Sequence, residues 1–291
     1  MVERTRVITD STCDLPATMV QEVGLEVVPL DVVFGKETFV DGVELTPSGF
    51  FDKLQTSPYF PSTSAPSIGR FLEVYERTLE RTRGTSLYSI HLLDSASKTR
   101  ENAEIALRQL AERDHRIRGI AKDSQQVSLG LGILARRAAQ LADQKHSLVE
   151  IDEEIDKLRP NVRTICVLPT LTFARKGGRL SKVKLAKTYI GTFLGIVPII
   201  AFQDGEMTDI GTSRIAKRLH TLVNKVRLLY EEHGKFEEIA IVHGNAVEDA
   251  NWVAGALDGS AKNDLGIYEL GPTVATHGGP GTIGVSILLA H

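Results

Sequence analysis

The chain opens with an apolar run that turns abruptly polar, residues 7–16, VITDSTCDLP. Residues 7–9 have the β-branched composition of a buried strand, and the small polar cluster Asp10-Ser11-Thr12 ends it. Asp14 is expected to cap the next helix, with Pro16 in the first turn, where a missing N–H costs nothing. A strand that passes straight into a helix is the start of an α/β fold.

The same alternation continues through the first half of the chain. The patterns predict further strands over residues 27–34, 87–90 and 117–121, and helices that begin at Ser67, Thr99, Ser128 and Ser147. Residues 147–150, SLVE, form a capping box at the start of the last of these helices. Strands alternating with helices of this length indicate a mostly parallel sheet covered by helices.

The second half of the chain has a different pattern of predicted elements. Short β-like runs occupy residues 164–168, 197–202, 239–242 and 283–289, and a turn at 203–206 indicates a hairpin. A long amphipathic helix is predicted over residues 215–233. We therefore expect an α/β protein of two domains. The N-terminal domain, 1–160, has a mostly parallel sheet, the C-terminal α/β domain, 161–291, has a mixed sheet, and the boundary lies at Pro160-Asn161.

The composition excludes several classes of function. The formal net charge of the 291 residues is −3, which gives no electrostatic footprint for nucleic acid. No stretch of about 18 apolar residues is present, so no stable membrane insertion is expected. The N-terminus shows no secretory signal pattern, and the two isolated cysteines, Cys13 and Cys166, fit a reducing compartment. We expect a cytoplasmic protein.

Four clusters of small polar residues lie where strand-like runs end, residues 10–12, 61–67, 94–99 and 276–281. Ligands of open α/β sheets bind at such strand ends. The hydroxyls of Thr63 and Ser64, and those of Ser97 and Thr99, precede predicted helices, so they could cap a helix, bind an anion or do both. In the fourth cluster, three glycines leave room for a ligand to approach the backbone beside His277.

Other chemistry has little support in the sequence. The eight histidines show no His-x-x-x-His spacing, so no metal site is expected. The nucleotide-binding P-loop pattern and the Gly-x-Ser-x-Gly pattern of hydrolases are both absent. Cys166 lies in an apolar strand and is interpreted as core. Residues 173–180, FARKGGRL, are either a helix end with a glycine stop or a turn that presents Arg179 to the ligand or a partner.

Five segments, taken in order, form a recognisable set. They are residues 9–16, TDSTCDLP; 63–67, TSAPS; 123–132, with Asp123-Ser124 and Ser128-Leu129-Gly130; 177–181, GGRLS; and 277–281, HGGPG. Together they resemble the DegV family of bacterial fatty-acid-binding proteins. The resemblance extends over essentially the whole chain. It implies two α/β domains with one long-chain fatty acid between them, its carboxylate in the cleft and its tail in the C-terminal domain.

Site residues follow from the resemblance, motif by motif. Thr63, Ser97 and His277 would hold the head group and Arg179 would lie nearby, with Ser64, Thr99 and Gly278 completing the ligand-binding set. The protein would be a carrier without a cofactor and without catalytic turnover of its own. A separate fatty acid kinase would phosphorylate the bound acid, and the carrier would deliver the acyl phosphate to phospholipid synthesis.

Two departures from the family pattern concern the head group and the partner. The family usually has Ser-Gly-Thr-Tyr where this chain has Ser97-Lys98-Thr99-Arg100, so Lys98 either points to solvent or joins the anion site. The segment after Met207 has only Arg214, Lys217 and Arg218 as approximate counterparts of a basic cluster common in the family. This weakens the expectation of kinase docking more than that of lipid binding.

Aliphatic residues of the second half are expected to line the tail. The candidates are Leu168, Leu171, Phe193, Ile196, Ile199 and Ile287, each of which could equally be ordinary core. Two other functions stay open. One is binding of a different amphipathic carboxylate, such as an isoprenoid or retinoid acid. The other is an acyl hydrolase that uses Ser97 with His277, although no carboxylate is identifiable to orient the histidine.

Overall fold

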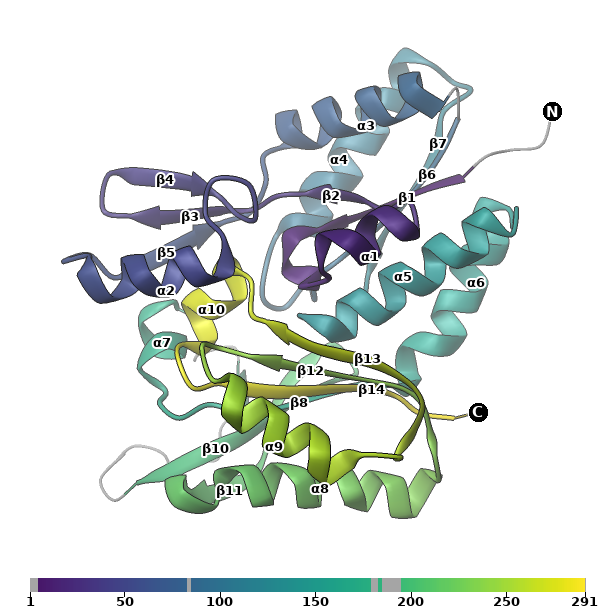
Figure 1. The fold of residues 1–291 in the computed structure, drawn as a ribbon. Coiled ribbons are helices and arrows are strands. Elements are labelled where there is room, and N and C mark those ends of the chain that lie inside the picture. The colour runs from purple at the N-terminus through teal and green to yellow at the C-terminus, as the bar shows by residue number, and fades with distance from the viewer. Residues whose placement is uncertain (1–4, 83–84, 179–182, 185–194, 291) are drawn as a thin grey trace.

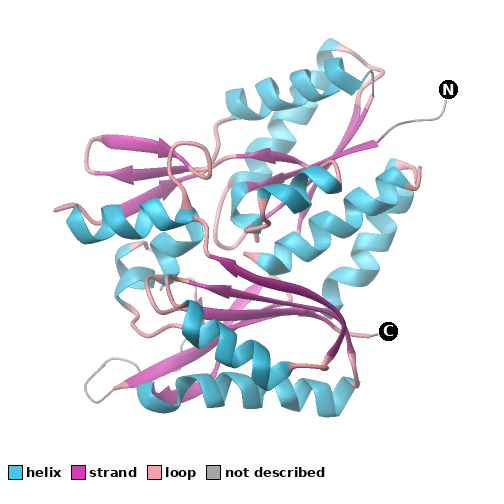
Figure 2. Cartoon of the chain, in the orientation of Figure 1, coloured by secondary structure: helices cyan, strands magenta, loops and turns pink. Residues whose placement is uncertain are grey.

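The computed structural model describes residues 5–82, 85–178, 183–184 and 195–290. Within these residues the strands form a four-stranded, a seven-stranded and a three-stranded sheet. The four-stranded sheet occupies the upper part of Figure 1 and the seven-stranded sheet the lower part. Helices flank the larger sheets (Figure 2), so the α/β class predicted from the sequence is confirmed.

The four-stranded sheet is parallel throughout, in the order β2-β1-β6-β7. Its strands are β1 (Thr5–Asp10), β2 (Glu26–Val28), β6 (Ser86–His91) and β7 (Arg118–Asp123). The helices around it are α1 (Ala17–Glu22), α3 (Ile68–Thr82), α4 (Thr99–Arg113), α5 (Leu129–Asp143) and α6 (Leu148–Leu158). Helices α3 and α4 share a core on one face, and α5 and α6 share a core on the other. The capping box predicted at Ser147 is present.

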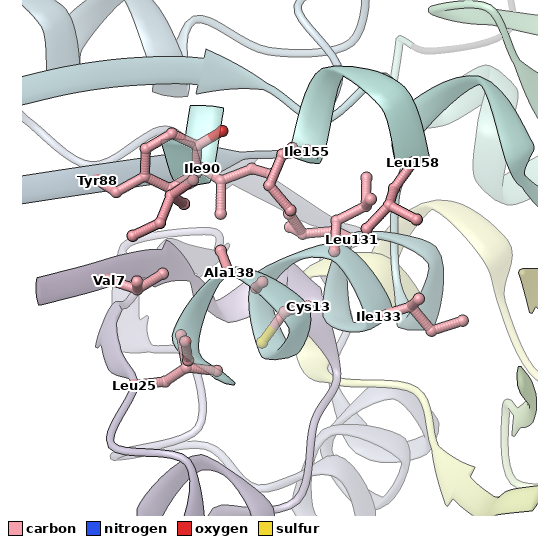
Figure 3. Close-up of a cluster of buried hydrophobic side chains, with 14 of the residues drawn as sticks. Val7, Cys13, Leu25, Tyr88, Ile90, Leu131, Ile133, Ala138, Ile155 and Leu158 are labelled. Carbon is pink, nitrogen blue, oxygen red and sulfur yellow. The ribbon is translucent and has the colours of Figure 1, made fainter. Parts of the chain in front are cut away.

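Apolar side chains from the strands and from α5 and α6 meet in a closed core (Figure 3). Val7 and Tyr88 come from neighbouring strands, and Leu131 comes from α5. Cys13 lies in the same core and is 2% exposed. Burial raises the pKa of its thiol well above the ordinary value, so Cys13 is an unreactive packing residue.

The seven-stranded sheet mixes parallel and antiparallel pairs, in the order β13-β12-β14-β8-β10-β11-β9. Its strands are β8 (Val162–Val167), β9 (Val183–Lys184), β10 (Ile196–Gln203), β11 (Glu206–Arg214), β12 (Phe236–His243), β13 (Ala261–Glu269) and β14 (Ile283–Leu288). Helices α8 (Arg218–His233) and α9 (Val247–Leu257) pack on one face. The predicted hairpin is confirmed. Asp204 and Gly205 both have positive φ, as a tight turn between β10 and β11 requires.

The third sheet corrects one prediction. Residues 27–34 were expected to form a single strand, but the chain leaves β2 at Val28 and begins β3 (Asp31–Phe34) in another sheet. Pro29 has no N–H to donate to a ladder, and the N–H of Leu30 donates to Ser11 Oγ. Strand β3 pairs with β4 (Glu37–Val40) and β5 (Pro61–Ser64), and α2 (Pro47–Thr56) follows β4 in the chain.

Asp14 does not cap α1, which is a second correction. Pro16 occupies the N-cap position and makes no side-chain cap bond. The Asp14 carboxylate is instead buried, where Ser128 Oγ and the N–H of Gly271 donate to it. These two partners come from distant parts of the chain, so Asp14 joins the two halves. The domain boundary at Pro160-Asn161 stays a prediction.

Candidate functional site

A largely apolar cavity lies between the four-stranded sheet and one face of the seven-stranded sheet. It encloses about 1020 Å³ when the open space at its mouth is included. Thr12 and Leu92 come from the segments just beyond the carboxyl ends of β1 and β6. That edge is where open α/β sheets bind ligands, as the polar clusters at the strand ends predict.

The floor of the cavity is the face of the seven-stranded sheet opposite α8 and α9. Val242, Gly284, Cys166 and Ile200 are paired across four neighbouring strands, and all four line the cavity. Gly284 makes a gap in this row, because a Cβ there would lie 2.9 Å from Val242 Cγ1. Three apolar side chains around a glycine form a smooth floor on which an alkyl chain can approach the backbone.

Thr63 and His277 meet at the partly exposed mouth of the cavity. Thr63 lies on β5, His277 lies on α10 (Pro272–Gly278), and His277 Nε2 is 2.9 Å from Thr63 Oγ1. Ser97, on the loop before α4, lines the same cavity, and its Oγ is 2.8 Å from Thr99 Oγ1. The structure therefore brings together the three residues predicted to hold a head group.

Two glycines allow α7 (Thr172–Lys176) to pack against the end of α10. A Cβ on Gly177 would lie 2.2 Å from His277 Nδ1, and one on Gly279 would lie 2.2 Å from the Phe173 ring. Glycine is therefore required at position 177, because any side chain there would overlap the His277 imidazole. In Figure 1, α7 and α10 lie next to each other beneath β5.

The other predicted site residues are distributed differently. Gly278 lines the cavity. Ser64 is exposed, with its Oγ directed to the carbonyl of Ala65, and Thr99 is buried behind Ser97, so neither reaches the cavity wall. Arg179 lies outside the described residues.

The two substituted positions after Ser97 face away from the cavity. The Lys98 side chain is 79% exposed and lies 3.4 Å from Glu101, which decides between the two alternatives in favour of solvent. Arg100 Nε donates to Asp94, and its guanidinium also pairs with Glu104. Both cations are neutralised by their own surface carboxylates.

Most of the predicted tail residues lie elsewhere. Of the six, Leu168 lines the cavity and Leu171 packs in the cluster beside it. Ile199 and Ile287 belong to the core under α8 and α9, and Ile196 is 45% exposed. Phe193 lies outside the described residues. Ile200, Phe202 and Met207 line the cavity instead. Cys166 is buried as predicted, but its side chain faces the cavity.

Five further residues with hydroxyl side chains line the cavity and were not among the predicted site residues. They are Thr12, Ser128, Thr164, Thr273 and Thr282. In the sequence, Thr12 belongs to the Asp10-Ser11-Thr12 cluster and Ser128 to a predicted helix start, whereas no pattern indicates Thr273.

Three of these hydroxyls, those of Thr12, Ser128 and Thr273, have a carboxylate beside them. Thr12 Oγ1 donates to Asp10, and Ser128 Oγ donates to Asp14, each at 2.5 Å. Desolvation raises the pKa of Asp14 well above its usual range, and it raises the pKa of Asp41, beside Thr273, to about 6.

Asp10 also belongs to a fully buried hydrogen-bond chain. His91 Nδ1 is 3.0 Å from Asp10 Oδ2, and His91 Nε2 is 2.6 Å from Ser89 Oγ, which in turn is 2.6 Å from the hydroxyl of Tyr75. The connectivity of Ser89, His91 and Asp10 is that of a nucleophile–base–carboxylate triad. All three side chains are 0% exposed, so no substrate reaches them, and the chain serves to fix the Asp10 carboxylate.

In the part of the chain that the structure describes, no helix is long and apolar enough to cross a membrane. Among those same residues, no group of three or more histidine, cysteine, aspartate or glutamate side chains is placed to hold a metal ion.

Comparisons with known proteins agree on one family. Residues 4–290 match the family model described as "Uncharacterised protein, DegV family". A DegV domain-containing protein of Halalkalibacterium halodurans is 29% identical over 281 residues, which is 96% of each chain.

Two solved structures are similar over nearly the whole length. One is described as showing fatty acid binding of a DegV family protein from Thermus thermophilus. It has 28% identity and a TM-score of 0.86, and the alignment covers 99% of this chain and 100% of that one. The other is DegV, a fatty acid binding protein from Bacillus subtilis, with 27% identity, a TM-score of 0.85 and the same coverage.

Proposed function

This chain belongs to the DegV family, and on that premise we propose that it binds one long-chain fatty acid in the cavity, carboxylate at the mouth and tail on the sheet. One observation carries the proposal, namely an apolar cavity whose mouth holds the paired Thr63 hydroxyl and His277 imidazole. The two solved relatives described as fatty-acid-binding support it.

The mouth has the donors that a carboxylate needs. A buried carboxylate is tolerated only when hydrogen-bond donors replace its water. Thr63, Ser97 and His277 each carry a group that can donate, and all three line the cavity while keeping partial exposure. Ser97 also lies beside the N-terminus of the 15-residue helix α4, where the helix dipole favours negative charge.

The apolar wall provides most of the binding free energy. A tail of about 14 methylenes gains roughly 11 kcal/mol when fully buried, at about 0.8 kcal/mol each. Ordering the chain and losing its free motion oppose several kcal/mol of this gain. If the opposing cost is about 3 kcal/mol, the remaining roughly 8 kcal/mol corresponds to a Kd of about 1 μM.

Calorimetric titration with hexadecanoate and with hexadecanol tests whether the head-group end of the site recognises a carboxylate. The wild-type protein should bind the acid at least about tenfold more tightly than the alcohol, because only the acid is an anion. Thr63→Val, which removes the hydroxyl at similar volume, should reduce this preference. Equal binding of acid and alcohol by the wild type would refute the head-group assignment.

A finer proposal concerns the partner. The carboxylate end lies at the partly exposed mouth, whereas tail-facing residues such as Ile200 and Met207 are buried. A separate fatty acid kinase can therefore reach the carboxylate without the tail leaving the cavity. The carrier would contribute no turnover of its own, would work in the cytoplasm where ATP is available, and would hand the acyl phosphate to phospholipid synthesis.

The kinase proposal has its own test. Loaded protein, a fatty acid kinase subunit and ATP should together yield acyl phosphate and ADP, and hydroxylamine traps the acyl phosphate as a hydroxamate. His277→Ala should lower the hydroxamate yield at equal lipid loading. If loaded wild-type protein gives no hydroxamate with an active kinase, the carrier role is wrong even if lipid binding stands.

A further inference from the structure

Two buried carboxylates from the first half of the chain bind the first turn of α10, the helix that carries His277 in its last turn. The N–H of Gly271, the N-cap residue, donates to Asp14 Oδ1 at 3.1 Å. Asp41 interacts with both the N–H and the hydroxyl of Thr273, the second residue of the helix. Neither carboxylate belongs to the described residues that line the cavity.

Both carboxylates are held in place by other residues of the first half. Asp41 Oδ2 accepts from Ser11 Oγ at 2.8 Å, and the N–H of Asp41 donates to the carbonyl of Leu30 at 3.0 Å. Asp14 accepts from Ser128 Oγ at 2.5 Å. Asp14 and Ser128 have positive φ, 52° and 55°, a backbone conformation that persists in non-glycine residues only where the surroundings hold it. The start of α10 is thus attached to a fixed frame.

Two carboxylates are a costly way to satisfy the end of one short helix. A Cβ on Gly271 would lie 2.7 Å from Asp14 Oδ1 and 3.8 Å from Asp41 Oδ1, so both groups converge on this residue. Desolvation raises the pKa of each carboxyl, and neighbouring aspartates add to both shifts. A serine or asparagine would accept from the same N–H without that cost. The arrangement therefore indicates a role beyond closing the helix end, since groups with shifted pKa values cluster at functional sites.

Helix α10 links the position of its first turn to the head-group site. Thr273 and His277 are one turn apart, about 6 Å along the axis, so a tilt of about 10° at the first turn moves the imidazole by about 1 Å. His277 Nε2 is 2.9 Å from Thr63 Oγ1, and a shift of that size takes the pair beyond hydrogen-bond range.

We propose that Asp14 and Asp41 are positioning residues, which act through α10 to place the His277 imidazole and thereby determine how well the mouth recognises a carboxylate. The inference rests on the proposed function, since it takes His277 as a donor to the head group. Neither aspartate touches the ligand.

The test compares the Kd values of hexadecanoate and hexadecanol by calorimetry. A protein that is merely destabilised loses affinity for both, whereas a misplaced imidazole weakens only the binding of the acid. Asp41→Ala should reduce the preference for the acid roughly three- to tenfold and change the Kd of hexadecanol less than about twofold. Asp41→Asn should retain most of the preference, because its amide oxygen still accepts from the N–H of Thr273.

Asp14→Ala and Asp14→Asn form a second pair with the same expectation. Where an alanine variant does not fold, Asp41→Glu gives the same information, because it keeps the charge and moves the carboxylate, and it should also reduce the preference. In the His277→Ala background, Asp41→Ala should cause little further loss. Glu238→Gln, in a buried ion pair with Arg136 outside the cavity, should lower stability and leave the preference unchanged.

The inference is overturned, with fatty-acid binding intact, if folded Asp41→Ala and Asp14→Ala keep the full preference or lose the acid and the alcohol equally. The same holds if Asp41→Asn behaves like Asp41→Ala, or if Asp41→Ala adds a full loss to that of His277→Ala. A wild-type protein that binds the acid and the alcohol equally, or binds neither, would instead contradict the proposed function, so the two failures are distinguishable.

Discussion

Replacing Gly177 by alanine should weaken fatty-acid binding through His277, although residue 177 is not among the cavity-lining residues. The new Cβ would lie 2.2 Å from His277 Nδ1 and 2.8 Å from its Cε1. It would also lie 3.0 Å from the carbonyl oxygen of Phe173, which leaves the backbone little freedom to retreat. The imidazole must therefore move by about 1 Å to reach ordinary contact distance.

A shift of that size is enough to lose the head-group geometry. His277 Nε2 is 2.9 Å from Thr63 Oγ1, and a further ångström puts the pair beyond hydrogen-bond range. A hydrogen bond to a charged ligand group is worth about 1.5–3 kcal/mol. The Kd for hexadecanoate should accordingly rise roughly 10- to 150-fold.

A double-mutant cycle shows whether the effect passes through the histidine. Calorimetry on wild type, Gly177→Ala, His277→Ala and the double variant gives the coupling. In the His277→Ala background the imidazole is gone, so Gly177→Ala should cost little more. Gly255→Ala in α9 is a matched control, because a Cβ there meets no atom within 4 Å. Independent, additive losses at 177 and 277, or no loss at 177, would refute the reasoning.

Three further predictions concern the floor and the frame of the cavity. Gly284→Ala should weaken hexadecanoate binding about fivefold or more in calorimetry, because the added methyl crowds the floor; unchanged affinity would place the tail elsewhere. Burial raises the pKa of Asp41 to about 6, above its unfolded value, so folding takes up a proton between about pH 4 and 6. The free energy of unfolding from urea titrations should therefore fall as pH rises through that window, by up to roughly 3 kcal/mol, and fall less in Asp41→Asn. Arg136→Met should lower the free energy of unfolding by about 3–5 kcal/mol, because it leaves the buried Glu238 carboxylate unpaired, and adding Glu238→Met should recover most of the loss.

Locally encoded features of the fold could be predicted from the sequence. The capping box at Ser147 and the helix from Thr99 to Arg113 depend on residues within a few positions of each other, and both are present. The strand predicted over 27–34 failed for the opposite reason. The sheet that β3 joins after Pro29 depends on its pairing with β4 and β5, and no local sequence pattern identifies these partners.

The tail residues could not be chosen because the seven-stranded sheet is buried on both faces. Strands buried on both sides are apolar throughout, so alternation no longer marks one face. Ile199 and Ile200 are equally apolar and equally buried, yet one faces α8 and α9 and the other faces the cavity. The phase of the strand is set by its register with β8 and β11, which the sequence does not reveal.

Residues of the candidate site that belong to sequence motifs could be predicted, and residues that only the fold brings to the cavity could not. Thr63, Ser97 and His277 carry recognisable motifs, and the structure brings them to one cavity. Thr273 has no motif, and its place follows from lying one turn before His277 on α10. Pro272, at the first turn of α10, is the local sequence signal for the start of this helix.

The most direct test of the account is the lipid content of the purified protein. Untreated protein is denatured and extracted with organic solvent, and the extract is quantified by mass spectrometry beside Thr63→Val and His277→Ala. The account predicts about one fatty acid per wild-type chain and a clear loss in both variants when they remain folded. A folded wild-type protein that is empty and takes up no added fatty acid would contradict it.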